Sequence, residues 1–247
     1  MERETPEARR RRLIRMGAIV AALVAIVALV LITPFEGGDD VEEPARNEEA
    51  AGPCNDEQPP EASAQQYDAP PPLELPAGVD YSAVIHTNCG DIAFDLLEDK
   101  APQTVASFVF LAREGFYDGI SFHRVEASVI QFGDPNGQNG EPPDGPGYTV
   151  PDEFPEQANE YVYGVVGLAN AGPGSGGSQV FIVTHDREGG SPAGYPPFYT
   201  IFGEVDSASF DVLDEIATLE TKGGNDPVEA VKPVDPVFIT SIEITEA

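Results

Sequence analysis

The sequence has 247 residues, 41% of them hydrophobic, which is enough to bury the core of one or two domains. It carries 43 acidic and 13 basic residues, for a formal net charge of −30. A surface this acidic repels nucleic acids and anionic lipids, so nucleic-acid binding is not expected. The simplest role of the charge is to keep the surface well solvated.

Residues 16–35 form an uncharged, mostly apolar stretch. At about 1.5 Å per residue, a helix of this length crosses a hydrocarbon core of roughly 30 Å. Arginines 9–12 precede the stretch and acidic residues follow it, so the positive-inside rule places residues 1–15 in the cytoplasm and the rest outside. We expect a single-pass protein of the cell membrane that contacts the lipid bilayer through residues 16–35. A cleaved signal peptide is the alternative, which Gly37 and Gly38 keep open.

Residues 36–79 are rich in proline and acidic residues and show no apolar periodicity, so they are predicted to be a disordered linker. This segment contains Cys54, and the only other cysteine of the chain is Cys89. Because cysteines outside the cytoplasm commonly pair, we predict a disulfide between them, with two free thiols as the alternative.

From residue 80 to residue 247 the pattern is that of a globular domain. Residues 81–87 and 91–97 flank an Asn88-Cys89-Gly90 turn, and Ile92, Phe94 and Leu96 alternate with more polar residues. This arrangement predicts a β-hairpin with one buried face.

Two helices are predicted in the domain. The first begins at Pro102, has apolar residues at helical spacing and stops at Gly115. The second covers about 209–219, where Phe210, Leu213 and Ile216 share a face.

Six further short strands are predicted at 121–125, 129–132, 163–168, 179–184, 200–205 and 237–245. Many short strands with only two helices indicate a mostly-β domain, folded as an antiparallel barrel or sandwich.

Three motifs carry little weight. Gly172 to Gly177 match the spacing of a dinucleotide-binding loop, but a strand-like segment follows where that motif needs a helix. The Ser175-Gly176-Gly177 triplet resembles the nucleophile loop of trypsin-like proteases, but no matching histidine or aspartate segment accompanies it. The three histidines lie far apart in the sequence, so no metal site is predicted.

A set of short segments, taken together, is much more specific. They occur in one fixed order between residues 81 and 244: 88–92 (NCGDI), 114–119 (EGFYDG), 122–125 (FHRV), 131–135 (QFGDP), 145–148 (GPGY), 152–154 (DEF), 167–171 (GLANA), 178–182 (SQVFI) and 199–203 (YTIFG). In sequence and order they resemble the cyclophilin-type peptidyl-prolyl cis-trans isomerases. The resemblance implies a closed eight-stranded antiparallel barrel capped by two α-helices, with a proline-binding groove on its outer surface. Residues 121–134 would form one wall of that groove.

The resemblance also implies roles for individual residues. Arg124 matches the catalytic arginine of the family. Substrate-binding roles fall on Phe122, Val129, Ile130, Gln131, Ala169, Asn170, Gln179, Phe181, Tyr195 and Tyr199. Val129 or Ile130 would stand where the family has a pocket methionine, and Tyr199 where many members have histidine.

Rotation about an X-Pro bond requires no cofactor and no covalent intermediate. Conjugation of the amide must be broken, against an activation energy of roughly 20 kcal/mol. A pocket that fixes the proline ring, together with an arginine that donates to the prolyl nitrogen in the twisted state, stabilises the transition state selectively.

The sequence departs from the family pattern around its central motif. One residue fewer separates Arg124 from Gln131, so a pocket phenylalanine of the family is missing. Phe132 replaces a family glycine, and would either crowd the wall or partly replace the lost ring. The chain has no tryptophan, so weak inhibition by cyclosporin is expected.

We therefore predict a membrane-anchored bacterial isomerase acting on proline-containing segments of secreted or envelope proteins. The alternative is a non-catalytic proline-peptide-binding module or holdase chaperone with the same fold, which the shortened segment after Arg124 leaves open.

Overall fold

The computed structural model describes residues 54–55, 58–62, 65–72, 75–136 and 145–247. The predicted cytoplasmic N-terminus and membrane span, residues 1–35, lie outside these ranges. Among the residues described, no helix is both long enough and apolar enough to span a bilayer.

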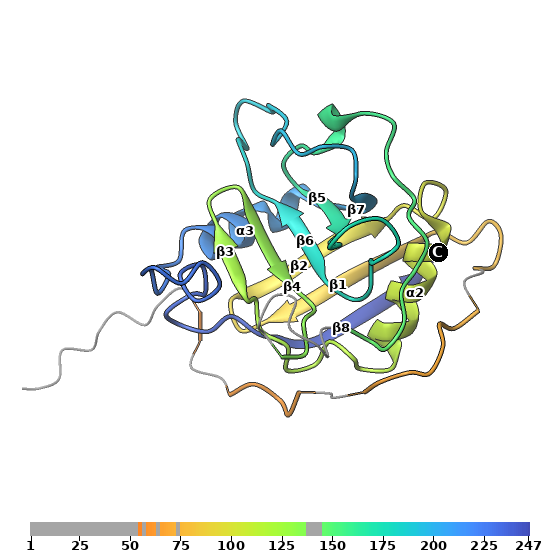
Figure 1. Cartoon of the computed structure of the whole chain (residues 1–247), viewed down its shortest axis with the longest axis horizontal. Helices are drawn as coiled ribbons and strands as arrows, with labels where there is room; N and C mark the ends of the chain where they lie inside the picture. The colour runs from red at the N-terminus through yellow and green to blue at the C-terminus, as the bar shows by residue number, and fades with distance from the viewer. Residues whose placement is uncertain (1–53, 56–57, 63–64, 73–74, 137–144) are drawn as a thin grey trace, which may run out of the picture. The chain divides into compact units, whose positions relative to one another are not determined.

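The domain is mostly β, with two α-helices (Figure 1). In chain order its elements are β1 (Tyr81–Thr87), β2 (Gly90–Leu96), α2 (Pro102–Arg113), β3 (Arg124–Glu126), β4 (Val129–Phe132), β5 (Val165–Leu168), β6 (Val180–Val183), β7 (Thr200–Val205), α3 (Phe210–Ala217) and β8 (Ile239–Glu246). The predicted strands at 129–132 and 200–205 agree with the structure in both bounds. The strand predicted at 121–125 is displaced, since β3 begins only at Arg124.

The eight strands form one antiparallel sheet in the order β3-β4-β6-β5-β7-β2-β1-β8. The outer strands β3 and β8 do not pair, although a bridge joins Ser121 to Phe238 beside them. In β3 itself, Val125 donates its N–H to the Val231 carbonyl at 2.8 Å, so the loop before β8 lies along the free edge of β3. The sheet is therefore not the fully closed hydrogen-bonded barrel that the resemblance implied.

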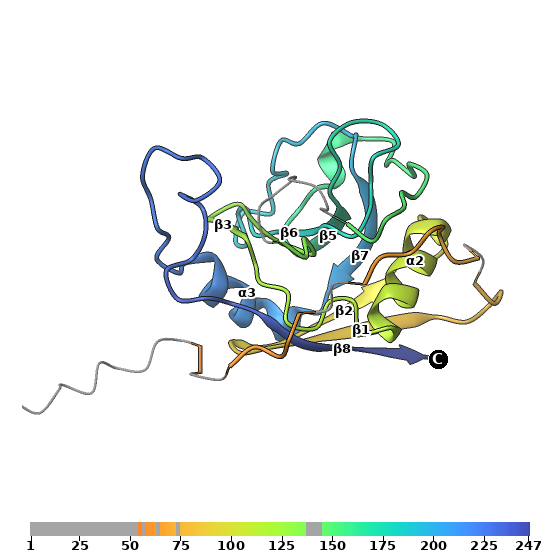
Figure 2. The same cartoon turned by 60° about the horizontal axis from the view of Figure 1, so that its bottom comes forward.

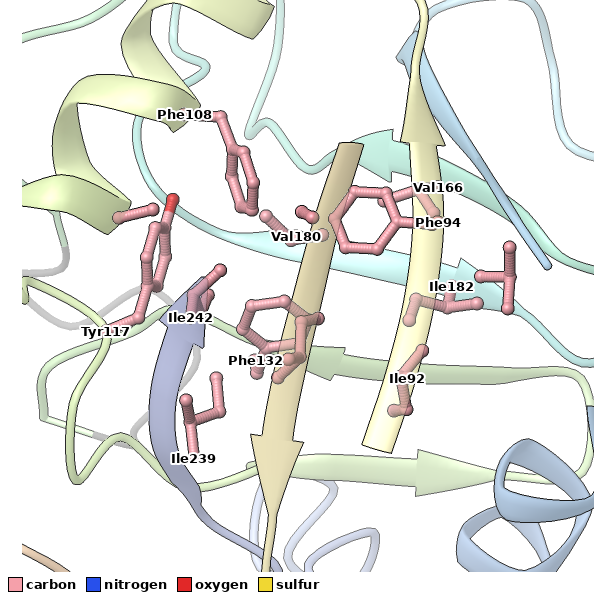
Figure 3. Close-up of a cluster of buried hydrophobic side chains, with 14 of the residues drawn as sticks. Ile92, Phe94, Phe108, Tyr117, Phe132, Val166, Val180, Ile182, Ile239 and Ile242 are labelled. Atoms are coloured by element: carbon pink, nitrogen blue, oxygen red, sulfur yellow. The ribbon is translucent and has the colours of Figure 1, made fainter. Parts of the chain in front are cut away.

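The core lies inside the curled sheet, where β1, β2 and β8 face the layer formed by β3, β5 and β6 (Figure 2). Its centre is a set of aromatic rings, in which Phe108 of α2 lies 5.7 Å from Phe94 and 5.4 Å from Tyr117. Figure 3 shows these rings together with Phe132 and aliphatic side chains from β2, β5, β6 and β8. The predicted buried face of the first hairpin is confirmed, because Ile92, Phe94 and Leu96 are all at most 5% exposed.

Helix α2 begins at Pro102, as predicted, and its first turn is capped by a residue that is distant in the sequence. Both carboxylate oxygens of Glu153 accept N–H groups of this turn, from Gln103 at 3.1 Å and Thr104 at 2.9 Å. A carboxylate here satisfies otherwise free N–H groups and complements the helix dipole. This cap lies about 50 positions along the chain from the helix it closes, so helical periodicity could not reveal it.

Part of the predicted linker packs against the domain. Cys54 and Cys89 form a disulfide. Farther along, the Tyr67 ring lies 5.0 Å from Phe110 and 6.3 Å from Tyr148 between ring centroids. The Tyr67 N–H also bonds to the Pro146 carbonyl at 2.8 Å. The described residues around Tyr67 are therefore attached to the domain and do not form the predicted disordered linker.

Candidate active site

The candidate site lies on the outer face of the sheet, where four strands place their residues in one row. Arg124 on β3 pairs with Gln131 on β4, which pairs with Phe181 on β6, which pairs with Gly167 on β5. Directly opposed residues of antiparallel strands point to the same face, so this register brings the arginine, the amide and the ring together. The register, more than sequence proximity, builds the site.

Gly167 makes room for the Phe181 ring. A Cβ atom at position 167 would lie only 2.3 Å from the Phe181 Cζ atom. The far end of the Phe181 ring therefore packs closely against the backbone of β5, and the ring forms the floor of the site.

A cavity of about 180 Å³ opens over this floor, large enough for a proline ring. Its lining residues are Arg124, Val129, Gln131, Ala169, Asn170, Phe181, Tyr195 and Tyr199. All eight were predicted from the sequence, and the structure brings them together. Gln179 lines a neighbouring cavity of about 350 Å³, which shares Gln131, Ala169 and Asn170 with the first.

Three rings supply the apolar part of the smaller cavity. Phe181 meets Tyr195 and Tyr199 edge to face, with centroids 6.1 and 5.7 Å away. Tyr161 supports them from below: its hydroxyl donates to the Tyr199 carbonyl at 2.7 Å and accepts the Tyr199 N–H at 3.1 Å. Burial raises the pKa of Tyr161, so the hydroxyl stays a donor at neutral pH. Sequence reasoning missed Tyr161, because its segment belongs to none of the motifs.

Arg124 sits at the mouth of the cavity, with about a third of its side chain exposed. Its Nε and one Nη donate to the two carboxylate oxygens of Glu126, each at 3.1 Å. These residues are two positions apart on β3, so they share a face. Of the five guanidinium N–H groups, three have no partner among the described residues and can reach a ligand.

The two amides of the site are themselves held in place. The Gln131 side chain donates to that of Gln179 at 2.8 Å. The Asn170 side chain donates to the Phe198 carbonyl at 2.7 Å and accepts the Gly172 N–H at 3.1 Å. The Asn170 side chain thus stabilises the loop that follows it and links this loop to Phe198. Its expected part in holding a peptide backbone stays a prediction.

Two predicted substrate-binding residues lie instead in the core. Ile130 is 0% exposed and Phe122 1% exposed, and neither lines the cavity. Ile130 points inward because its neighbours on β4, Val129 and Gln131, point outward. Phe122 precedes β3. Its N–H donates to the Val237 carbonyl at 2.9 Å, which places Phe122 between the two edge strands β3 and β8.

Phe132 does not replace the missing pocket ring. It is 0% exposed and packs inside the domain, 5.0 Å from Phe122 and 5.9 Å from Tyr117. The shortened segment forms a tight hairpin in which only Ala127 and Ser128 separate β3 from β4. The pairing of Arg124 with Gln131 survives this shortening. The rings of Tyr195 and Tyr199 provide aromatic surface in the cavity.

His123 is a core residue and not a catalytic base. It is 2% exposed, and within the described ranges neither ring nitrogen has a hydrogen-bond partner. Burial lowers its pKa to about 4, although the nearby Asp134 charge acts in the opposite direction. The ring is therefore neutral at pH 7. Among the described residues there is also no cluster of three histidine, cysteine or acidic side chains suited to a metal ion.

Known proteins match both the sequence and the fold. A family model described as cyclophilin type peptidyl-prolyl cis-trans isomerase/CLD matches residues 82–244. Peptidyl-prolyl cis-trans isomerase A of Mycobacterium tuberculosis is 41% identical over 182 residues, which cover 66% of this chain and 92% of that protein. A crystal structure of a Cryptosporidium parvum cyclophilin type peptidyl-prolyl cis-trans isomerase in the presence of the dipeptide Ala-Pro has a TM-score of 0.53 at 26% identity, covering 66% of this chain and 98% of that one.

Other relatives are longer than the matched domain. Probable peptidyl-prolyl cis-trans isomerase B of M. tuberculosis is 38% identical, and the match covers 68% of this chain but 54% of that protein. A putative bifunctional phosphatase/peptidyl-prolyl cis-trans isomerase of Streptococcus pyogenes is also 38% identical, with 41% of its length covered. The chain thus spans about half the length of these two relatives. With the family model covering most of its length, the chain belongs to the cyclophilin-type peptidyl-prolyl cis-trans isomerase family.

Proposed function

We propose that this protein accelerates cis-trans isomerisation of X-Pro bonds in polypeptides. The observation that carries the proposal is the 180 Å³ cavity, which combines an aromatic floor with the guanidinium of Arg124. A fold neighbour crystallised in the presence of Ala-Pro adds support from outside the chain.

The aromatic part of the cavity would hold the proline ring. Phe181, Tyr195 and Tyr199 present apolar edges and faces, so burial of the ring fixes one side of the bond while the other side rotates. No proton needs to move, and no covalent bond is made or broken.

Arg124 would supply the stabilisation specific to the transition state. In the planar amide the prolyl nitrogen lone pair is delocalised, whereas in the twisted state it becomes an acceptor. A guanidinium N–H that donates to this nitrogen lowers the barrier without tightening ground-state binding equally. Glu126 accepts only the Nε and one Nη donor of Arg124, so the other guanidinium N–H groups are left for the substrate.

Arg124→Ala tests this assignment. Loss of one preorganised donor typically costs about 10²–10³-fold in rate, so kcat/KM on a proline tetrapeptide should fall by that order. Arg113→Ala is the matched control, since Arg113 is also a surface arginine paired with a carboxylate, Glu246. A wild-type rate no faster than the uncatalysed reaction would rule out the proposed activity.

A proline-peptide-binding module or holdase is the second candidate. The bidentate Arg124–Glu126 pair favours it, because it occupies two donors of the catalytic arginine. In that case wild type would bind a proline peptide with measurable affinity yet leave its cis-trans exchange rate unchanged in NMR exchange spectra.

We also propose that residues 16–35 anchor the protein in the cell membrane, with the isomerase domain outside the cytoplasm. The clients would then be secreted or envelope proteins, and weak cyclosporin inhibition is expected because the chain has no tryptophan. Protease added to intact cells should cleave the domain from the anchor. Full protection would contradict this orientation.

A further inference from the structure

We propose that the segment around Gln66, which precedes the family domain, completes the peptide groove, and that Gln66 selects a neutral, hydrogen-bond-donating side chain beside the proline. This proposal rests on the proposed function, in that the smaller cavity holds the proline. It assigns a specificity role to a residue outside the matched range 82–244.

The segment is fixed to the domain at several points. The Tyr67 backbone N–H bonds to Pro146 and its ring packs between Phe110 and Tyr148. Gly147 allows the close approach, because a Cβ there would lie 2.6 Å from the Tyr67 carbonyl oxygen. Together with the Cys54–Cys89 disulfide upstream, these contacts make the segment part of the domain surface.

Gln66 forms one wall of the 350 Å³ cavity beside the proline cavity. Gln131, Ala169 and Asn170 line both cavities, so a peptide whose proline occupies the smaller one places a neighbouring residue in the larger. The Gln66 side chain lines the larger cavity and is also exposed to solvent.

The lining of this larger cavity favours neutral polar ligands. Its described lining residues include glutamine, asparagine, serine and threonine side chains and no charged one, although the chain carries 43 acidic residues. Burial of a charge without a partner is costly, whereas a neutral hydroxyl or amide can exchange its water contacts for these groups.

The orientation of the Gln66 amide makes the preference directional. Its Nε2 donates to the Gly145 carbonyl, which fixes the amide and leaves Oε1 as an acceptor near Gly147. Because Gln66 Oε1 accepts hydrogen bonds, it favours a peptide side chain that can donate one. Serine, threonine, asparagine or glutamine should therefore be preferred beside the proline. Aspartate should be disfavoured, since its oxygens would face Oε1.

The test uses the full-length chain and proline peptides with serine or alanine at each position flanking the proline. We expect serine to be preferred over alanine at one position, by about 2–10-fold in kcat/KM, the range of a typical net hydrogen bond. Gln66→Met, which keeps the size of the side chain but removes its polar atoms, should abolish this preference. Gln58→Met should retain it, because Gln58 is an exposed glutamine of the same segment outside the cavity lining.

Two outcomes would overturn the inference: no serine preference at any position in wild type, or a preference that survives Gln66→Met. Dissociation constants for the same peptides give a readout independent of turnover. If wild type binds with the Gln66-dependent preference but does not catalyse, the proposed function fails and the inference stands.

Discussion

The β3–β4 hairpin has two faces with different roles: the inner face belongs to the core, and the outer face belongs to the candidate site. The inner face places Ile130 and Phe132 in the core, both 0% exposed, while the outer face places Arg124, Val129 and Gln131 around the proline-sized cavity. Because side chains alternate along a strand, a single register decides both sets. Changes on the inner face should therefore alter stability, and changes on the outer face should alter catalysis.

Phe132→Ala should give the largest effect on stability. Removal of a buried phenyl group typically costs about 3–5 kcal/mol, from lost burial and from the cavity left behind. The free energy of unfolding from urea denaturation checks this value. Phe198→Ala is the control, since Phe198 is 59% exposed and should cost far less.

If the two faces act separately, Phe132→Ala should also lower kcat/KM far less than Arg124→Ala does, when measured at a temperature where the variant stays folded. Equal losses of activity would show that the inner face controls the catalytic geometry.

Cys54→Ser tests how much the disulfide that attaches the segment before the domain contributes to the free energy of unfolding. The disulfide closes a loop over a sequence separation of 35, and loss of such a cross-link typically costs about 2–4 kcal/mol. Cys89→Ser should cost the same, and the double variant should cost no more than either, because all three remove one bond. Additive losses in urea denaturation would indicate that each cysteine contributes by packing instead.

His123 makes the stability of the inner region depend on pH. Its folded-state pKa of about 4 lies below the ordinary value of 6.5, so between these values the unfolded chain binds more protons and stability rises with pH. Acidification from pH 7.5 to pH 5 should therefore remove about 2 kcal/mol of unfolding free energy, at 1.36 kcal/mol per pKa unit.

His123→Asn should remove most of this loss, as measured by urea denaturation at the two pH values. An equal loss in wild type and variant would assign the acid sensitivity to other groups.

Features of the fold and the site that depend on residues close together in the sequence could be predicted from it, whereas contacts between distant residues could not. Alternation and turn residues located the strands. The ordered motifs contain six of the eight residues that line the smaller cavity, and the family resemblance added Val129 and Tyr195. Ile130 and Phe122 were misplaced because a motif names a segment but not the face to which each side chain points. Tyr161 and the helix cap by Glu153 were missed since both act through contacts 38 to 50 positions away. The docking of Tyr67 was hidden by a surrounding composition typical of disorder.

Glu126→Gln should give the smallest effect, and it tests the outer face alone. An ion pair about one-third exposed is typically worth about 0.2–1 kcal/mol. Glutamine keeps the shape of the side chain but removes the charge that competes with substrate for Arg124. We therefore expect kcat/KM to rise about 1.5–5-fold, with little change in unfolding free energy. Glu246→Gln, which releases Arg113, should leave kcat/KM unchanged. A fall in kcat/KM on Glu126→Gln would show instead that the carboxylate serves mainly to position the guanidinium, and that the paired arginine is the active form.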